Sequence, residues 1–380
     1  MSAPWLRVRA LFDRVADAWF ALRNRMLSNA AFQTWSTRFP LTRFIARRKA
    51  STLFDICAGF VYSQVMQASV RLGLLEAVRD GPRSPEQLAP ALGLSLDATQ
   101  RLLDAASSIE LVQRRGGRYI LGLQGCSYIG NPALAKMVEH NGIFYRDLAD
   151  PVALLRGDHP QTELNRFWGY ADPSSPAPTG DAVAPYSEFM ASTISLLAED
   201  VLEAYPVTKH RRLLDVAGGE GAFVEAVATR VPELALTLFD LPPVAQRAAQ
   251  RIERAGLSSR VTVSPGDLFA DSLPKGADLV SLVRVLHDHD DEQVLRILAA
   301  VRQAMQPGGV LLVAEPMSST AAHPPMGSAY FGFYLLAMGQ GRPRTPDELS
   351  ELLRQSGFVH PKLRGTRRPI LTQLISAEVA

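Results

Sequence analysis

The 380-residue chain has little cysteine and no long apolar segment. Its two cysteines, Cys57 and Cys126, are too few for a disulfide framework or a zinc cluster, and they fit a reducing cytosol. No apolar run has the length of a membrane span, and the N-terminus lacks the uninterrupted apolar segment of a signal peptide. The 47% hydrophobic content is typical of a globular protein. We therefore expect a cytoplasmic protein with two domains and an extension.

Charge is small overall but unevenly distributed. The net charge is +2, yet residues 1–50 hold ten arginines and lysines against two aspartates, which leaves a net −6 on the rest of the chain. Trp5, Trp19 and Trp35 also lie in this N-terminal arm (residues 1–50). Arginine mixed with large aromatics suits an anionic surface above an apolar layer, as at a membrane interface. Packing on the rest of the protein or on a partner chain explains the aromatics equally well, and nucleic acid is a distant third.

A helical region follows, and its centre has the layout helix, turn, helix, hairpin. Ser84-Pro85 starts one helix, a second helix runs from about Leu96 to Ile109, and a hairpin turns at Gly116-Gly117. This is the layout of a winged helix, which by itself suggests DNA binding. The second helix, however, offers only Arg101 as a cation for base contacts, and its acids would repel phosphate. We therefore expect the fold without a nucleic-acid partner.

The second half of the chain alternates strands with helices. A Pro/Ser/Ala-rich connector (residues 171–187) precedes a helix from about Glu188 to Tyr205. Apolar strands are expected at residues 212–217, 234–240, 277–286 and 309–315, and residues 358–379 can add an antiparallel hairpin. This alternation predicts an α/β fold with a mostly parallel, doubly wound sheet. The expected domains are the arm 1–50, a winged-helix domain 51–170, the connector 171–187 and an α/β domain 188–380.

The first of these strands runs into the glycine-rich turn DVAGGEGAF, residues 215–223. Glycines at a strand-to-helix turn let the backbone approach a ligand at the edge of the sheet where nucleotides bind. The dinucleotide fingerprint G-x-G-x-x-G fails at its third glycine, where Val224 stands. The candidate cofactor-binding residues are Asp215, Gly218, Gly219, Gly221, Asp240, Leu241, Asp267, Leu268 and Arg284. Among them, Asp240 is expected to accept ribose hydroxyls, and Asp267 with Leu268 to meet an adenine.

Four motifs, DVAGGEG, FDLP, GDLF and LHDHDDE, resemble in order and spacing those of the S-adenosylmethionine-dependent O-methyltransferases of the caffeate/isoflavone and acetylserotonin type. The resemblance covers the chain from about Tyr186 onward by motif and the winged-helix region by layout. It implies S-adenosylmethionine as cofactor and a Rossmann-like methyltransferase domain. It also implies a winged-helix dimerisation domain that walls the substrate pocket, and hence a homodimer.

The segment LHDHDDE, residues 286–292, matches the family motif H-D-W-x-D, whose histidine is the general base. The resemblance puts this role on His287, with Asp288 beside it and His289 in place of the family tryptophan. Histidine suits proton removal near neutral pH, and a sulfonium already activates the methyl group, so no metal is required. We expect no metal site at these two histidines. The acids 290–292 are expected to start the next helix.

Carboxylates are expected to orient this base. A base of this kind needs an orienting group on its second nitrogen, and Glu315 matches the family glutamate with that role. A second family glutamate lies in a G-x-E-R-T segment, but here the segment reads GRPRT, with Pro343 at the glutamate position. That support is missing or is supplied differently, for which Asp288 is the candidate.

The substrate residues of the family map onto two apolar stretches. The matching positions are Met190, Phe333, Tyr334 and Met338, with Tyr330 nearby. Methionine and aromatic side chains at helical spacing are equally well explained as plain core. Taken together they imply an apolar acceptor with one hydroxyl.

The chain is also similar to the bacterial carotenoid O-methyltransferases in FDICAGFVYSQVMQASVRLGLLEAV, in MGQGRPRT and in the end of the arm, RFPLTRFIARRKA. Those enzymes methylate the tertiary hydroxyl of acyclic carotenoids such as hydroxyneurosporene and demethylspheroidene, on the route to spheroidene and spirilloxanthin. The resemblance implies a lipophilic hydroxycarotenoid substrate, and it suggests that the arm docks on the inner or photosynthetic membrane. Three alternatives remain: an O-methyltransferase of a small phenol or polyketide, a winged-helix regulator that senses S-adenosylmethionine, and a non-catalytic dimeric scaffold.

Overall fold

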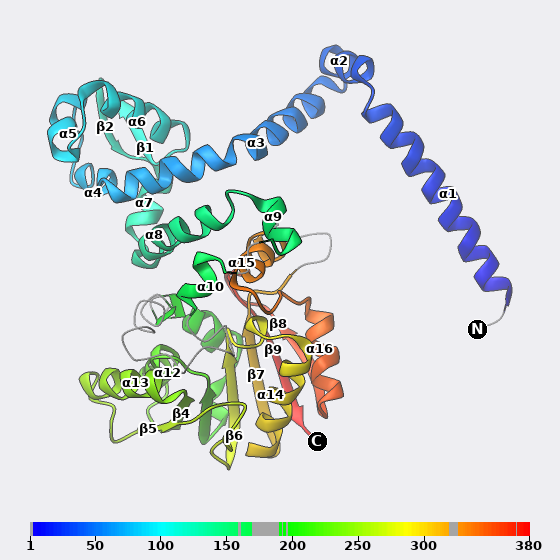
Figure 1. Ribbon diagram of the computed structural model, residues 1–380, viewed down its shortest axis with the longest axis vertical. Helices are drawn as coiled ribbons and strands as arrows, with labels where there is room; N and C mark the ends of the chain where they lie inside the picture. Colours follow the sequence, from blue (N-terminus) through cyan, green and yellow to red (C-terminus); the bar gives the residue numbers. More distant parts are fainter. Residues whose placement is uncertain are drawn as a thin grey trace. The chain divides into compact units, whose positions relative to one another are not determined.

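The computed structural model describes residues 3–158, 161–168, 190–191, 193–194, 197–318, 326–369 and 371–380. Two compact units, Met1–Ile129 and Gly130–Ala380, make up the chain, and Figure 1 shows their elements. The predicted connector, residues 171–187, lies outside the described residues. The domain boundaries expected from the sequence stay predictions.

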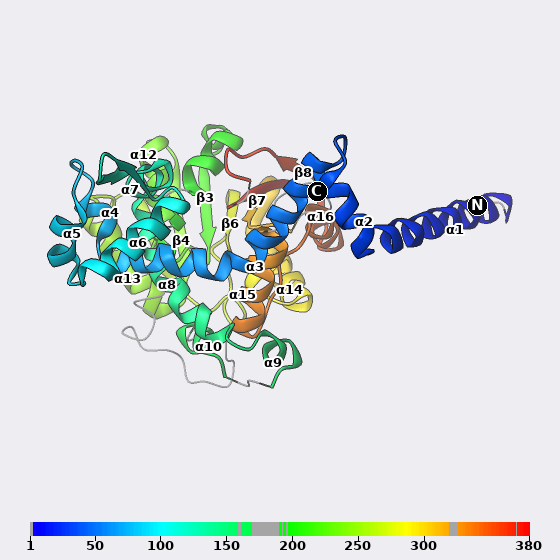
Figure 2. The same cartoon turned by 90° about the horizontal axis from the view of Figure 1, so that it is seen from above.

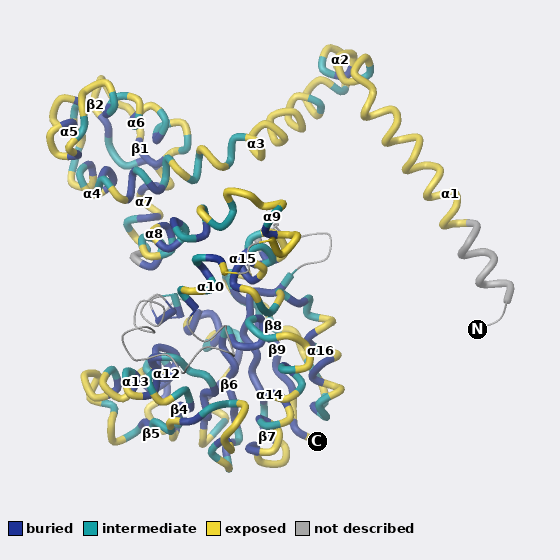
Figure 3. Tube along the Cα trace, in the orientation of Figure 1, coloured by how far each residue is buried: buried dark blue, intermediate teal, exposed yellow. Residues whose placement is uncertain are grey.

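The first unit is mainly helical. Its elements are α1 (Ala3–Leu27), α2 (Ala30–Arg38), α3 (Arg43–Arg71), α4 (Leu74–Ala77), α5 (Pro85–Leu92), α6 (Leu96–Ser108), β1 (Val112–Arg115), β2 (Arg118–Leu121) and α7 (Leu123–Ile129). Residues 12–31 of α1 and its junction with α2 are exposed, whereas the part from α4 to β2 encloses a core (Figure 3).

The predicted helix–turn–helix–hairpin layout is present. Ser84 caps α5 in a capping box with Gln87, and Gly93 ends this helix in a left-handed conformation with φ 66°. The hairpin β1–β2 turns at Gly116 and Gly117, whose φ angles of 54° and 79° favour glycine. The helix cap and the glycine turns that the sequence predicted are therefore the features that begin and end these elements.

The second unit begins with helices and continues as an α/β domain. Its elements are α8 (Pro132–Asp147), α9 (Pro151–Arg156), α10 (Glu163–Phe167), β3 (Arg212–Val216), α12 (Ala222–Arg230), β4 (Ala235–Asp240), α13 (Pro242–Arg254), β5 (Val261–Pro265), β6 (Ala277–Val283), α14 (Asp291–Ala304), β7 (Met305–Glu315), α15 (Phe331–Met338), α16 (Pro346–Gln355), β8 (Phe358–Arg364) and β9 (Gln373–Val379). The described residues of the helix predicted at 188–205 are helical up to residue 204.

A seven-stranded sheet runs through this unit in the order β5-β4-β3-β6-β7-β9-β8. The strands from β5 to β7 are parallel, and β9 pairs antiparallel with both β7 and β8. The strand order reverses between β3 and β6, which is where open α/β sheets bind their ligands. The predicted fold class, doubly wound and Rossmann-like, is confirmed, and so is the C-terminal hairpin.

Alternating residues of the central strands feed two separate cores. Leu213 of β3 packs in one core with α12 and α13, and Leu214 packs in the other with α14 and α16. Because successive side chains of a strand point to opposite faces, one apolar segment supplies both cores. Helices therefore cover both faces of the sheet (Figures 1 and 2).

Two details of the strand prediction were wrong. β6 ends at Val283, three residues before the predicted end, because Arg284 takes a left-handed φ of 58° and residues 286–288 form a 3₁₀ turn. The strand β5 was missed because VTVSP is short and only Val261 is buried in it. The first difference shapes the site, since it turns the chain at the sheet edge.

Candidate active site

A cavity of about 430 Å³ lies at the carboxyl ends of the parallel strands β3, β4, β5 and β6. Residues that directly follow each strand border it, such as Ala217, Leu241, Gly266 and Arg284. Four carboxylates but one guanidinium line the cavity, and even with Glu220 paired to Arg247 three carboxylates remain, so the charge of the lining favours a cationic ligand. The carboxylates belong to Glu220, Asp240, Asp267 and Asp288. The volume is in the range of a small-molecule site.

The glycine-rich turn forms one wall of this cavity. A side chain at Gly218 would place its Cβ 2.4 Å from Asp215 Oδ2, so only glycine fits there. Gly219 and Gly221 have φ angles of 59° and 83°, which glycine adopts without strain. The turn thus brings the backbone against the cavity, as the sequence predicted for a nucleotide-binding turn.

Two aspartates at this end are held by fixed contacts. Asp240 accepts hydrogen bonds from the Gly219 and Leu241 amides, each at 2.7 Å, and burial raises its pKa to about 6. Asp215 accepts a hydrogen bond from the Ser281 hydroxyl at 2.6 Å, and burial raises its pKa to about 7. Asp240 borders the cavity, whereas Asp215 supports the turn from behind it.

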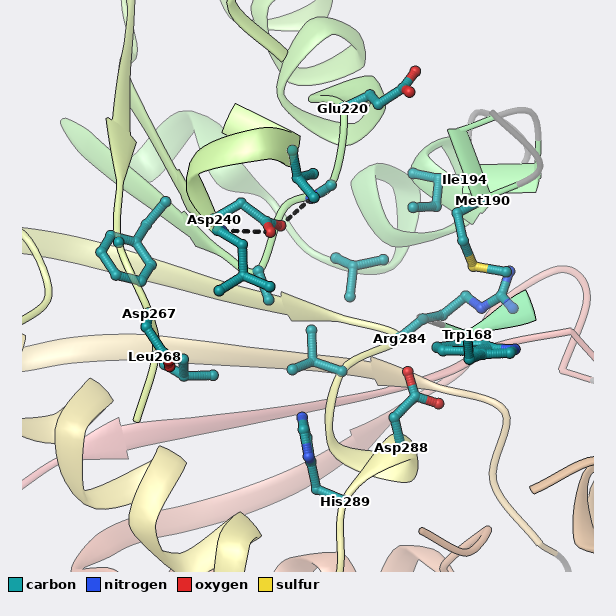
Figure 4. A pocket seen from close by; sticks show the side chains of 18 of the residues that line it. Trp168, Met190, Ile194, Glu220, Asp240, Asp267, Leu268, Arg284, Asp288 and His289 are labelled. Atoms are coloured by element: carbon teal, nitrogen blue, oxygen red, sulfur yellow. Dashed lines mark hydrogen bonds between the residues drawn. The ribbon is translucent and has the colours of Figure 1, made fainter. Parts of the chain in front are cut away.

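Another wall comes from the segment that follows β5 and from the residues of and after the 3₁₀ turn that follows β6. Asp267 Oδ1 accepts a hydrogen bond from the Phe269 amide at 2.8 Å, and Leu268 presents an apolar side chain to the cavity. The Phe269 ring meets the His289 ring edge-on, with centroids 5.4 Å apart. Figure 4 shows Asp240, Asp267 and Leu268 at one end and Arg284, Trp168 and Met190 at the other.

The predicted base and its carboxylate are brought together by neighbouring strand ends. His287 lies on the 3₁₀ turn after β6, and Glu315 is the last residue of β7. His287 Nδ1 is hydrogen-bonded to Glu315 Oε2, while Glu315 Oε1 accepts from the Val285 and Leu286 amides at 2.9 and 2.7 Å. Glu315 therefore fixes both the imidazole and the turn that carries it.

Asp288 occupies the second side of the imidazole. His287 Nε2 lies 3.1 Å from Asp288 Oδ1, an atom without a hydrogen-bond partner among the described residues. Burial lowers the pKa of His287, but the charges of Asp288 and Glu315 outweigh this effect and raise it. Burial raises the pKa of Asp288 to about 6. Nε2 and the Asp288 carboxylate are thus close enough to pass a proton from one to the other.

The cavity meets the neighbours of His287 and not its ring. Asp288 and His289 both border the cavity and point into it (Figure 4), whereas His287 is buried behind them, with its ring 6.3 Å from that of Phe331. Burial and the charge of His287 lower the pKa of His289 to about 4, so this second imidazole is neutral near pH 7. Within the described residues, no group of three or more histidines, cysteines or acids is arranged to hold a metal ion.

The GRPRT segment supports the turn although its glutamate is absent. Arg344, which is 2% exposed, donates hydrogen bonds to the Leu286 and His289 carbonyls at 2.8 and 2.6 Å and to Asp291. The Arg342 amide donates to the His287 carbonyl at 2.9 Å. The sequence analysis did not identify Arg344, because it compared this segment with the family motif only at Pro343.

Most of the predicted substrate residues lie beside the cavity and do not border it. Met190 borders it, whereas Phe333, Tyr334 and Met338 pack in a cluster with residues of α8, α9 and α10. Trp168, which sequence reasoning missed, joins the two regions, since it belongs to this cluster and borders the cavity. The sequence does mark this residue, because Trp168 is the one tryptophan outside the N-terminal arm.

A buried hydrogen-bond network holds this cluster. The Tyr334 hydroxyl oxygen accepts from Trp168 Nε1 at 3.2 Å and lies 2.8 Å from His140 Nε2. Burial raises the pKa of Tyr334 and lowers that of His140 to about 4, so both groups stay neutral. Arg284 donates a hydrogen bond to the Thr193 hydroxyl at 2.9 Å and points to the same end of the cavity.

An acidic cavity at the carboxyl ends of parallel strands, with a carboxylate-held histidine beside it, is where an α/β enzyme of this topology binds a nucleotide-like ligand. Models of two families match the chain: an O-methyltransferase domain over residues 145–359 and an O-methyltransferase dimerisation domain over residues 54–125. The chain belongs to the O-methyltransferase family. The predicted class of S-adenosylmethionine-dependent O-methyltransferase is thereby confirmed.

Individual relatives agree with this assignment. The chain is 43% identical to the demethylspheroidene O-methyltransferase of Cereibacter sphaeroides, a match that covers 93% of each chain. It is 39% identical to that of Rhodobacter capsulatus, over 90% of this chain and 85% of the relative. A crystal structure of human N-acetylserotonin methyltransferase in complex with S-adenosylmethionine matches with a TM-score of 0.72 and 25% identity, over 87% of this chain and 98% of that one.

Proposed function

We propose that this protein transfers a methyl group from S-adenosylmethionine to the tertiary hydroxyl of an acyclic hydroxycarotenoid of the hydroxyneurosporene or demethylspheroidene type. The observation that carries the proposal is the 43% identity, over 93% of both chains, to a demethylspheroidene O-methyltransferase. We further propose that the enzyme acts on the route to spheroidene and spirilloxanthin. A small phenol or polyketide is the alternative acceptor.

The residues that border the cavity suit the cofactor. Asp240 would accept hydrogen bonds from the ribose hydroxyls, and Asp267 and Leu268 would contact the adenine. The Gly218–Gly221 turn would contact the methionine part of the cofactor. When bound, S-adenosylmethionine supplies an electrophilic methyl group on a positively charged sulfur. The surplus of carboxylates in the lining stabilises that positive charge.

The catalytic group is His287 with its two carboxylates. We propose that His287 is the general base, held by Glu315, and that the acceptor proton reaches it through Asp288, the member of the group that borders the cavity. As the new oxygen–carbon bond forms and the sulfur–carbon bond breaks, the hydroxyl proton becomes strongly acidic. A carboxylate at the cavity wall can then accept it. This role for Asp288 offsets the family glutamate that Pro343 replaces.

The acceptor end of the cavity suits an apolar molecule. The polar atoms of Tyr334, His140 and Trp168 are engaged with each other, so they demand no hydrogen bond from a substrate. Met190, Phe333 and Met338 supply apolar surface in or beside this end. A polyene with one hydroxyl meets these conditions better than a molecule with many polar groups.

The assembly follows from the first unit. We propose a homodimer through residues 54–125, the segment that matches the dimerisation model. Exposed apolar residues at the start of this segment, Phe54, Ile56 and Phe60, are available for a second copy. Within the described residues, no helix is both long and apolar enough to cross a membrane. We also propose that the enzyme meets its substrate at a membrane surface through residues 1–50.

A methyl-transfer assay tests the chemistry. His287→Ala should abolish turnover of a hydroxylated carotenoid, with cofactor affinity, measured by calorimetry, retained, because the ring lies behind the cavity wall. Retained turnover in this variant would remove the proposed base. A wild-type enzyme that methylates small phenols and ignores the carotenoid would instead replace the substrate and leave the chemistry in place.

A further inference from the structure

The elbow between α2 and α3 presents a surface that the proposed chemistry does not use. We define the elbow surface as Leu41, Arg43, Phe44, Ile45, Arg47, Arg48 and Ser51. We propose that this surface docks the protein on an anionic phospholipid bilayer, with the arginines on lipid phosphates and the apolar side chains in the interfacial layer. The inference deepens the proposed function by naming how a bilayer-dissolved acceptor is reached.

The elbow is a built turn with its own contacts. Asn29 caps α2 by accepting a hydrogen bond from the Phe32 amide at 3.0 Å, and the Trp35 and Phe39 rings stack with centroids 4.7 Å apart. The Thr42 hydroxyl donates to the Ser36 carbonyl at 2.8 Å, which ties the start of α3 to α2. These contacts hold the first turns of α3 in a defined position against α2.

Three arginines surround a shallow hollow on this elbow. Arg43, Arg47 and Arg48 border a space of about 390 Å³ together with Phe44 and Ser51. Arg43, Arg47 and Ser51 follow each other at intervals of four residues, so they lie in line on one side of the helix. The acid nearest to them along the chain is Asp55, which lies on α3 about two turns beyond Arg48 and outside the hollow, and all three arginines are exposed. The charge of the hollow is therefore left for an external anion.

Large apolar side chains stand exposed beside these charges. Leu41 is 82% exposed, Phe44 75% and Ile45 62%. Along α1, exposed apolar residues recur every three or four positions and form one stripe, namely Phe12, Val15, Trp19, Leu22 and Met26. A helix with aromatics and aliphatics among arginines is suited to lie in a membrane interface.

A lipid surface fits the elbow better than a second copy of the chain. Two copies would bring their arginine clusters together, and like charges repel. The segment that matches the dimerisation model starts at residue 54, after the elbow surface ends at Ser51. The elbow surface is therefore not part of the segment that the family uses for dimerisation. An anionic bilayer offers both partners that the surface needs, phosphate for the arginines and an apolar layer for Leu41, Phe44 and Ile45.

Vesicle co-sedimentation with the full-length protein tests the proposal. The vesicles are phosphatidylcholine alone or an equimolar mixture with phosphatidylglycerol, and they contain no acceptor. We expect the wild type to bind the mixed vesicles only, less tightly as salt is raised. The triple variant Arg43→Gln/Arg47→Gln/Arg48→Gln should lose about a hundredfold in affinity, since each basic residue near the surface contributes about fivefold.

A matched control removes the same charge elsewhere. Arg114→Gln/Arg115→Gln/Arg118→Gln changes three exposed arginines of the β1–β2 hairpin and should bind the mixed vesicles as the wild type does. The variant Phe44→Ser/Ile45→Ser keeps every charge and should bind more weakly than the wild type. Sedimentation velocity without vesicles should give the same oligomeric state for all variants.

Three results would overturn the inference: equal binding of the wild type to both vesicles, undiminished binding of the elbow triple variant, or an oligomeric state altered by that variant alone. The last result would assign the elbow to a second copy. Methyl transfer to a detergent-dispersed hydroxycarotenoid is measured in parallel and should be unaffected by the elbow triple variant. Because the vesicles carry no acceptor, a wrong substrate would leave the binding result standing.

Discussion

Arginines in two regions of this protein meet opposite conditions. Arg344 is buried and donates hydrogen bonds to the Leu286 and His289 carbonyls and to Asp291. Arg43, Arg47 and Arg48 on the elbow are exposed around a hollow. A buried guanidinium that is fully hydrogen-bonded is a structural part of the site. Exposed guanidinium groups that lie together are available to bind an external anion.

The contacts of Arg344 explain how the site tolerates a proline at position 343, where the family has a glutamate. Support for the 3₁₀ turn comes from Arg344 and from the backbone of the GRPRT segment, neither of which needs the glutamate. The turn in turn sets His287 against Glu315 and leaves Asp288 at the cavity. Losing the buried arginine should therefore damage catalysis, and losing the exposed ones should not.

The largest effect is expected from Arg344→Ala. This change takes one donor from the buried Leu286 carbonyl and the side-chain donor from the His289 carbonyl, and it leaves a cavity in place of a buried side chain. It should cost about 3–5 kcal/mol of unfolding free energy, with turnover reduced about a hundredfold. Denaturant unfolding and steady-state kinetics measure the two effects. Arg342→Ala is the matched control, because its ion pairs with Asp291 and Glu348 are exposed and should contribute less than about 1 kcal/mol. Equal losses in both variants would contradict the assignment.

Gly341→Ala should have the next largest effect. Gly341 has a φ of 76°, and a Cβ there would lie 2.2 Å from the His287 carbonyl oxygen, so the turn must shift. We expect about a tenfold lower kcat with a smaller change in KM, since the turn carries the catalytic group. Gly332→Ala, where a Cβ meets nothing within 4 Å, is the control. An unchanged kcat in Gly341→Ala would show that the turn is not held from this side.

The pH dependence of turnover distinguishes Asp288 from His287. The pKa of Asp288 is raised to about 6, and its carboxylate form accepts the proton, so turnover should fall as the pH drops below about 6, by about tenfold per unit. Asp288→Asn should lower kcat and remove this acidic limb, and Asp288→Glu should restore part of it. If the limb persists unchanged in Asp288→Asn, it belongs to His287 acting directly on the acceptor.

The smallest effect is expected from the elbow. Arg43→Gln/Arg47→Gln/Arg48→Gln should change the unfolding free energy by no more than about 0.5 kcal/mol, because exposed side chains outside a network contribute little. Thermal unfolding by circular dichroism measures this. A large loss of stability would mean that the elbow arginines hold the fold, which would remove the contrast with Arg344.

Much of the fold could be predicted from the sequence. Local patterns placed the winged-helix layout, four of the parallel-sheet segments and the final hairpin, because apolar periodicity, caps and glycine turns act over a few residues. The motifs also led to the cofactor turn and to the pairing of His287 with Glu315. What could not be predicted depends on contacts between distant segments, such as Tyr334 with His140 and Trp168.

The sequence by itself determined the family, the order of the elements and the set of residues at the strand ends, since these follow from local preferences and from motif spacing. Only the tertiary structure decided which neighbour in His287-Asp288-His289 borders the cavity. The 3₁₀ turn rotates successive side chains by about 120°. Arg344, far along the chain, holds that turn in place. A one-dimensional pattern contains neither the rotation nor the distant contact that fixes it.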